Sequence, residues 1–346
     1  MRYIPELDGL RGIAILMVFC FNYDPGLLPG GWLGVEFFFV LSGFLITSLW
    51  LAEYADTGEI DLKAFFIRRA LRLLPALTVL ITVYALLALI RGAALGEVAL
   101  SLLAVLFHSA NWARAFGWPV ELRHLGHTWS LSIIEQFYLL WPLALLGLLA
   151  LAKNTQRIAA ILCAVVASIA VYRASLSIGG ASVDRLYNGF DTRADGLLIG
   201  AIVAFAPSSR LSRVYFVIAV AVLVAFAVIG DYHSQAFYLG LLTVVAIWMA
   251  LLLSWIVSRP KAQFLRFAPL VWVGRISYGI YLWHYPVIKA KLLLSQSAAA
   301  QFVFNLAASL VLAAASFYLV EKPFLRAKRK FRRAETLYAV RAVNRS

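Results

Sequence analysis

Charged residues are scarce in this chain of 346 residues, and acidic residues are the scarcest of them. Asp, Glu, Lys and Arg together make up 14% of the sequence, against 63% hydrophobic residues, and the mean hydropathy is +0.85. Soluble globular domains carry roughly 25% charged residues, because a polar surface must cover their core. The composition therefore excludes a soluble globular protein, and no polar stretch is long enough to form a separate soluble domain.

Cysteine is nearly absent as well. Cys20 and Cys163 are the two in the chain, and both fall within apolar runs. Two cysteines cannot build the disulfide framework of a small secreted domain, and we expect no disulfide between them.

Apolar runs of about 20 residues, the length at which a helix crosses a bilayer, recur along the sequence. They predict an all-α, polytopic integral-membrane protein with about ten transmembrane helices in one bundle. The predicted spans are 8–24, 33–52, 74–92, 129–152, 156–176, 194–206, 214–231, 236–257, 277–293 and 298–320. A weaker run at 97–112 is either a re-entrant or interfacial segment or a sign that another span is miscounted. No small-residue cleavage site follows the first run, so we interpret it as a retained helix.

Basic residues outnumber acidic ones, and the formal net charge is +14. Such an excess also occurs in nucleic-acid-binding proteins, but in a membrane protein Lys and Arg concentrate in cytoplasmic loops. Here they crowd the segment at 68–72 and a tail that begins near residue 322. We therefore expect a multi-pass protein of the cell membrane with both termini in the cytoplasm. The transmembrane domain would cover 1–326, and a basic tail at 327–346 would contact lipid headgroups, with no nucleic-acid partner.

The first apolar run begins with a charged pair and ends with an amide. Asp8 and Arg11 stand at its start, and Asn22 follows Arg11 by eleven residues in LDGLRGIAILMVFCFN. On a helix, that spacing brings Asn22 within about 20° of Arg11 and about 16 Å along the axis. The two side chains are predicted to lie on one face and to form the wall of a site that reaches into the membrane.

A second basic group lies in DLKAFFIRRALRLLPAL, at 61–77. We expect Asp61 to cap a short amphipathic helix on which Arg68, Arg69 and Arg72 cluster on one side. By charge alone, this cluster predicts a cytoplasmic anchor.

Other stretches place polar side chains inside or beside apolar runs, where such residues are costly and often functional. The stretches are GVEFFFVLSGFLIT (34–47), GHTWSLSIIEQFYLLWP (126–142), NGFDTRADGLLIG (188–200) and RISYGIYLWHYP (275–286). Their candidate site residues are Glu36, Ser42, His127, Trp129, Ser130, Glu135, Arg193, Asp195, Tyr281 and His284. A purely structural role stays open for three of these residues. Glu36 could be a charge that extends to the membrane interface, His284 a packing residue held by hydrogen bonds, and Asp195 a favourable charge in the first turn of a helix.

Taken in order, these stretches resemble the motifs of the acyltransferase 3 family of integral-membrane acyltransferases. The resemblance covers essentially the whole chain and includes RRxLR, HxWSLxxExQ-type and DxRxDxLxxG patterns and the closing Glu-Lys-Pro-Phe at 321–324. In that closing motif we expect Pro323 to end the last helix and Glu321 to pair with an arginine inside the bundle. It implies transfer of an acyl group, usually acetyl, from cytoplasmic acyl-coenzyme A to a hydroxyl of a glycan, a lipid-linked sugar or a small natural product. No metal is implied. The resemblance assigns the coenzyme A phosphates to the arginines, and the cofactor-binding residues are then Arg11, Arg68, Arg69 and Arg72.

The sequence departs from the family pattern at two positions. Asn22 stands where the family usually has its presumed catalytic histidine, and Ile134 stands where it has the first of two acids. Glu135 lies about 100° further round the helix and cannot simply replace that acid. An amide cannot accept the hydroxyl proton at pH 7 as a histidine does.

Two function classes therefore remain open. The chain is either an active acyltransferase that uses another base, for which His127 and His284 are the candidates, or a catalytically inactive member that binds its ligand without turnover. A secondary transporter fits the composition, but no inverted repeat is visible.

Overall fold

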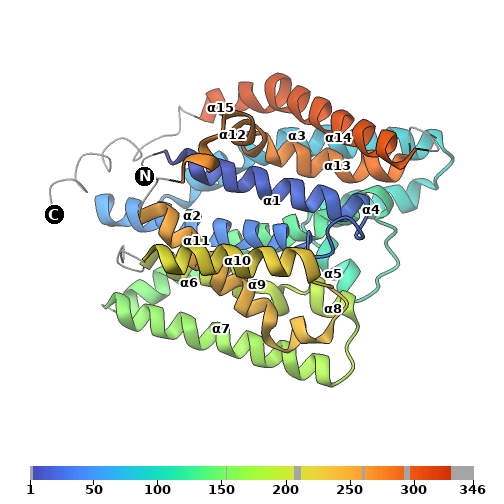
Figure 1. Ribbon diagram of the computed structural model, residues 1–346. Helices are drawn as coiled ribbons and strands as arrows, with labels where there is room; N and C mark the ends of the chain where they lie inside the picture. The colour runs from blue at the N-terminus through green and yellow to red at the C-terminus, as the bar shows by residue number, and fades with distance from the viewer. Residues whose placement is uncertain (1–2, 153, 206–211, 259–261, 292–296, 329–346) are drawn as a thin grey trace.

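The computed structural model describes residues 3–152, 154–205, 212–258, 262–291 and 297–328, and within these ranges every regular element is helical. The longer helices run roughly along one direction (Figure 1). The start of α1 and the end of α15 lie at one end of this bundle, and α5 and α8 lie at the opposite end. The predicted tail at 327–346 lies almost wholly outside the described residues.

The described helices follow the predicted spans closely. The α-helices are α1 Pro5–Tyr23, α2 Leu33–Thr57, α3 Leu62–Ile90, α4 Leu95–Leu106, α5 Ala110–Ala115, α6 Trp129–Leu151, α7 Thr155–Ile178, α8 Val183–Asn188, α9 Phe190–Phe205, α10 Arg213–Ile229, α11 Leu242–Ser258, α12 Ala268–Arg275, α13 Ser277–Ala290, α14 Ala298–Ala315 and α15 Lys322–Lys328. Short 3-10 segments η1 Arg123–Thr128 and η3 Gln263–Arg266 precede α6 and α12, and π-helical segments η2 Phe237–Leu241 and η4 Ser316–Glu321 precede α11 and α15. Within the described residues, each of the ten predicted ranges overlaps a helix or two consecutive helical segments. By length and apolarity alone, 6 of the described helices can cross a membrane, and α4 and α10 are shorter apolar helices.

The ambiguous run at 97–112 is not a single helix. It is divided between α4, which has 12 residues, and α5, which has 6 residues. At 1.5 Å per residue α4 is about 18 Å long, well short of the ~30 Å hydrocarbon core. Neither α4 nor α5 is therefore long enough by itself to cross the hydrocarbon core as a straight helix.

Glycines set the closest helix contacts at the centre of the bundle, where α2 packs against α1 and α9. A methyl group added at Gly43 would lie 1.8 Å from the carbonyl oxygen of Leu197, and one added at Gly200 would lie 1.9 Å from that of Val40. Only glycine permits such an approach of two backbones.

Two local predictions were wrong. Asp61 does cap the helix that carries the arginines, since it accepts a hydrogen bond from the amide of Ala64, but that helix is not short. It continues through Pro75 to Ile90 as one element. Pro323 was expected to end the last helix, yet it lies in the first turn of α15. A proline is tolerated there because the wider π-helical turn before it already interrupts the regular hydrogen bonds.

Candidate functional site

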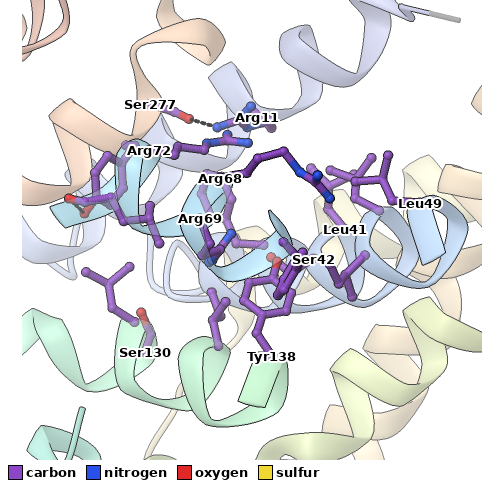
Figure 2. A pocket seen from close by; sticks show the side chains of 18 of the residues that line it. Arg11, Leu41, Ser42, Leu49, Arg68, Arg69, Arg72, Ser130, Tyr138 and Ser277 are labelled. Atoms are coloured by element: carbon purple, nitrogen blue, oxygen red, sulfur yellow. Dashed lines mark hydrogen bonds between the residues drawn. The ribbon is translucent and has the colours of Figure 1, made fainter. Parts of the chain in front are cut away.

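A cavity of about 380 Å³, the central cavity, lies among α1, α2, α3, α6 and α13. Its wall is mostly apolar, with side chains such as Leu41, Leu49 and Trp50. Four arginines also line it, together with one glutamate, Glu53. These arginines are Arg11, Arg68, Arg69 and Arg72, and Figure 2 shows their side chains converging from two directions.

The helical spacing of the arginine motif explains this convergence. Arg68, Arg69 and Arg72 lie within little more than one turn of α3, so their side chains can share one side of the helix. Arg11 comes from α1, where it pairs with Asp8 at 3.4 Å. Its guanidinium also donates a hydrogen bond to Ser277 at 3.0 Å, drawn in Figure 2.

Arg69 is the most firmly held of the four. Its Nε donates to Glu135 at 3.0 Å, and its guanidinium lies over the ring of Tyr138 at 3.8 Å from the centroid. Arg69 also borders a second cavity of about 240 Å³, the side cavity, which is lined by Glu135, His108 and apolar residues. The ion pair between Arg69 and Glu135 therefore stands where the two cavities meet.

Neighbouring residues of α6 face different cavities. Ser130, Ile134 and Tyr138 recur every four residues and line the central cavity. Glu135 lies on the side cavity. Successive residues of an α-helix are rotated by about 100°, so adjacent residues of α6 face different cavities. The same rotation keeps the carboxylate of Glu135 away from the position of Ile134.

A group of aromatic rings extends inward from the end of the central cavity. Tyr281, on α13, shares a hydrogen bond of 2.6 Å with Ser130, and its hydroxyl donates to the carbonyl oxygen of His127 at 2.5 Å. The ring of His127 packs 5.3 Å from that of Tyr281 and 5.6 Å from that of His284. His127 is 4% exposed, and both its ring nitrogens lack a hydrogen-bond partner among the described residues.

The ring of His284 is held on both sides. Its Nδ1 lies 2.8 Å from the carbonyl oxygen of Tyr281, so this nitrogen carries the proton and donates. Its Nε2 then accepts from the amide of Asn22 at 3.4 Å. Because Arg11 and Asn22 both contact α13, the prediction that they share one face of α1 is confirmed.

A buried charged network lies beside this group, between α2 and α9. Arg193 donates to Glu36 at 2.6 Å, and both side chains are fully buried. The guanidinium lies 4.8 Å from the ring centroid of Tyr187 and 5.8 Å from that of Trp129. Asp195 pairs with Arg173 at 2.8 Å. Pairing at both carboxylates makes these charges tolerable in a buried setting.

The structure thus brings half of the predicted site residues to one cavity. The central cavity is lined by Arg11, Ser42, Arg68, Arg69, Arg72, Ser130, Ile134 and Tyr281. Asn22, His127 and His284 form the ring group beyond it, Glu135 faces the side cavity, and Glu36, Trp129, Arg193 and Asp195 belong to the charged network. Glu321 was expected to pair with an arginine, but its only hydrogen bond among the described residues comes from Ser316.

Sequence reasoning missed several lining residues, among them Glu53, Ser277 and Tyr278. Tyr138 was also missed, although its spacing from Ser130 and Ile134 already predicts a common helix face. In the described part of the chain, no cluster of three His, Cys, Asp or Glu side chains could hold a metal ion. Cys20 and Cys163 are free, as predicted.

The family model described as "Acyltransferase domain" matches residues 4–320. The chain belongs to this family. It is 34% identical to a peptidoglycan O-acetyltransferase of Listeria monocytogenes, over 93% of this chain and 56% of the relative. It is 35% identical to a putative peptidoglycan O-acetyltransferase of Bacillus subtilis, over 93% of this chain and 55% of the relative.

A putative O-acetyltransferase of Staphylococcus aureus is also 35% identical, over 94% of this chain and 58% of the relative. The chain therefore spans little more than half the length of these relatives. No solved structure matches it. Family membership and the apolar helices together make this chain a membrane protein of an acyltransferase family.

Proposed function

We propose that this chain is an integral-membrane O-acyltransferase that moves an acetyl group from cytoplasmic acetyl-coenzyme A to a hydroxyl of a glycan. The observation that carries the proposal is the central cavity, in which four arginines meet a mostly apolar wall. A nucleotide thioester fits both parts of this wall, because its anionic phosphates would bind the arginines and the acyl end of its arm is apolar.

The arginines supply the donor end of the site. A planar guanidinium binds phosphate oxygens through two parallel hydrogen bonds, which gives both affinity and orientation. Arg68 and Arg72 lie on the cavity wall near the start of α3, and Ser130 and Tyr281 lie on the same wall further inward. The thioester would then point from the arginines toward Ser130.

His127 is the residue that we assign as general base. A base needs a free lone pair within reach of the proton that it takes. Both nitrogens of His284 are engaged, whereas both nitrogens of His127 lack a partner among the described residues. His127 precedes Ser130 by three residues, so it lies about one turn beyond the inner end of the cavity.

The chemical step balances with this single base. As the acceptor hydroxyl oxygen attacks the thioester carbonyl carbon, His127 takes the hydroxyl proton. The new C–O bond forms, the C–S bond breaks, and the proton passes from His127 to the sulfur of coenzyme A, which leaves as the thiol. His284 and Tyr281 pack against the imidazole and act as positioning residues.

A glycan is the acceptor that the relatives favour, since two of them bear names that specify peptidoglycan. No relative's name identifies the donor, so acetyl-coenzyme A rests on the arginine cavity and on the family resemblance.

The test is turnover by the purified protein in lipid nanodiscs, with labelled acetyl-coenzyme A and a glycan acceptor. We expect His127→Ala to lower the transfer rate by about 10²–10⁴-fold, the usual contribution of a general base, and to leave coenzyme A binding unchanged. His124→Ala, on the same short helix η1, is the matched control and should retain the rate. Unchanged turnover in His127→Ala would remove this residue from the mechanism.

Asn22 provides a second arm of the test. If the unmodified chain binds coenzyme A but transfers no acetyl group, the double variant Asn22→His with Ile134→Glu restores the residues that the family resemblance places there. Turnover by that variant alone would identify the natural chain as an inactive member and would overturn the proposed function.

A further inference from the structure

A stacked pair of aromatic rings, one exposed and one partly buried, marks the end of the bundle opposite the start of α1. Trp112, on α5, and Phe116, directly after it, have ring centroids 5.5 Å apart and planes that differ by 15°. Phe116 is 57% exposed. Helix α8 packs against α5, and the two lie side by side at this end in Figure 1.

A fixed ion pair borders these rings. The guanidinium carbon of Arg185, on α8, lies 5.1 Å from the ring centroid of Phe116 and 5.9 Å from that of Trp112. Arg185 binds Asp191 through both terminal nitrogens, and one of these contacts measures 2.9 Å. The hydrogen bonds to Asp191 raise the pKa of Arg185 above its usual range, so the guanidinium stays charged. We call Trp112, Phe116, Arg185 and Asp191 the aromatic platform.

The aromatic platform adjoins the ring group of the proposed reaction centre. Arg114 lies on α5 between Trp112 and Phe116, and it donates to the carbonyl oxygen of Gly126 at 3.3 Å. Gly126 directly precedes His127 in η1. Arg114 also pairs with Asp184 of α8 at 3.1 Å. Helix α5, which carries Trp112 and Phe116, therefore packs against the segment that carries His127, with Arg114 on the side of α5 opposite the two rings.

We propose that the aromatic platform docks one pyranose ring of the acceptor. A pyranose has an apolar C–H face, which gains dispersion contacts on a flat ring, and a rim of hydroxyls that both donate and accept hydrogen bonds. Phe116 offers the flat ring, Asp191 offers acceptor oxygens, and Arg185 offers donors. This inference rests on the proposed function and specifies where its glycan binds.

Anchoring at the membrane interface is the competing role, because exposed aromatic residues gather there in many membrane proteins. Anchoring at the membrane interface does not require an ion pair with two hydrogen bonds, such as that of Arg185 with Asp191, packed beside the rings. Trp118, 47% exposed in the following loop, has no ring contact among the described residues and is suited to anchoring alone. It is therefore the matched control.

The experiment measures binding and transfer separately in nanodiscs. Its probe is a β-1,4-linked tetrasaccharide of N-acetylglucosamine, and binding is followed by saturation-transfer NMR without any donor. We expect Phe116→Ala and Asp191→Asn each to weaken binding about tenfold, with Phe116→Tyr close to the unmodified protein. In turnover, the same two variants should raise the KM for the tetrasaccharide about tenfold and leave the KM for acetyl-coenzyme A and kcat unchanged.

Because the binding measurement needs no turnover, failure of the proposed function and failure of this inference are distinguishable. Equal losses in Phe116→Ala and Trp118→Ala would assign both residues to membrane anchoring and overturn the inference. Absence of tetrasaccharide binding by the unmodified protein would also overturn it. Thermal melts confirm that each variant is folded, and the exposure of Phe116 makes its truncation tolerable.

Discussion

Single residues of the arginine cluster differ in how much of their charge is already neutralised. Arg69 pairs with Glu135, Arg68 lies 3.7 Å from Glu53, and Arg11 pairs with Asp8. In the described part of the chain, no acidic side chain lies within salt-bridge distance of Arg72. A phosphate bound at Arg72 would displace no existing ion pair, so this residue should contribute the most to donor affinity.

We predict that Arg72→Ala weakens coenzyme A binding by tenfold or more, measured by titration calorimetry. The estimate follows from ~1.5–3 kcal/mol for a hydrogen bond to a charged group, with tenfold corresponding to about 1.4 kcal/mol. Arg157→Ala is the control, because Arg157 is exposed on α7 and lines neither cavity. Equal affinities for Arg72→Ala and the unmodified protein would exclude Arg72 from the donor site.

Spacing along one helix was enough to predict some contacts of the site but not others. It placed the arginines together, and it separated Glu135 from the position of Ile134. It could not predict that Arg69 pairs with Glu135, because the two lie on different helices and meet only through the packing of α3 on α6. For the same reason, the sequence could not predict that Arg11 bonds to Ser277, which lies on another helix.

At the scale of whole elements, α2 and α9 approach closely because glycines leave no side chain between them. We predict that Gly43→Ala lowers the melting temperature, since its added methyl would collide with the backbone of Leu197. Overpacking of this kind typically costs about 1–3 kcal/mol. The collision is with backbone, so no side chain can move aside to relieve it.

Gly147→Ala is the control for this substitution. Gly147 lies within α6, is exposed, and has no neighbour within 4 Å of an added methyl group. Alanine forms helix better than glycine by about 1 kcal/mol, so this variant should melt at the same temperature or higher. If Gly43→Ala melted at the same temperature as Gly147→Ala, the predicted collision with the backbone of Leu197 would be contradicted.

Apolar length predicted the existence of the helices but not their continuity. Pro75 and Pro323 are each compatible with a break, yet the chain stays helical on both sides of each proline. Whether a proline terminates a helix depends on the hydrogen bonds of the preceding turn, and neighbouring helices decide those. The sequence alone also left 97–112 ambiguous, because two short apolar helices have the composition of one long helix.

The whole molecule has two dissimilar ends. The arginines of α3 share their cavity with Arg11, in the first half of α1, whereas α5 and α8, which carry most of the aromatic platform, lie at the end opposite the start of α1 (Figure 1). Basic residues concentrate on the cytoplasmic side of membrane proteins, and acetyl-coenzyme A is a cytoplasmic compound. Both considerations favour the same orientation, with the donor site open to the cytoplasm and the aromatic platform facing outward.

We therefore predict that both termini lie in the cytoplasm. An alkaline phosphatase reporter, which folds only outside the cytoplasm, should be inactive when fused after Ser346 and active when inserted in the loop at Pro25–Gly26, between α1 and α2. Positive charge near the chain end opposes its translocation, which is the physical basis of the expectation. The reverse pattern would place the arginines outside, where no acetyl-coenzyme A is available, and would contradict the proposed donor together with the topology.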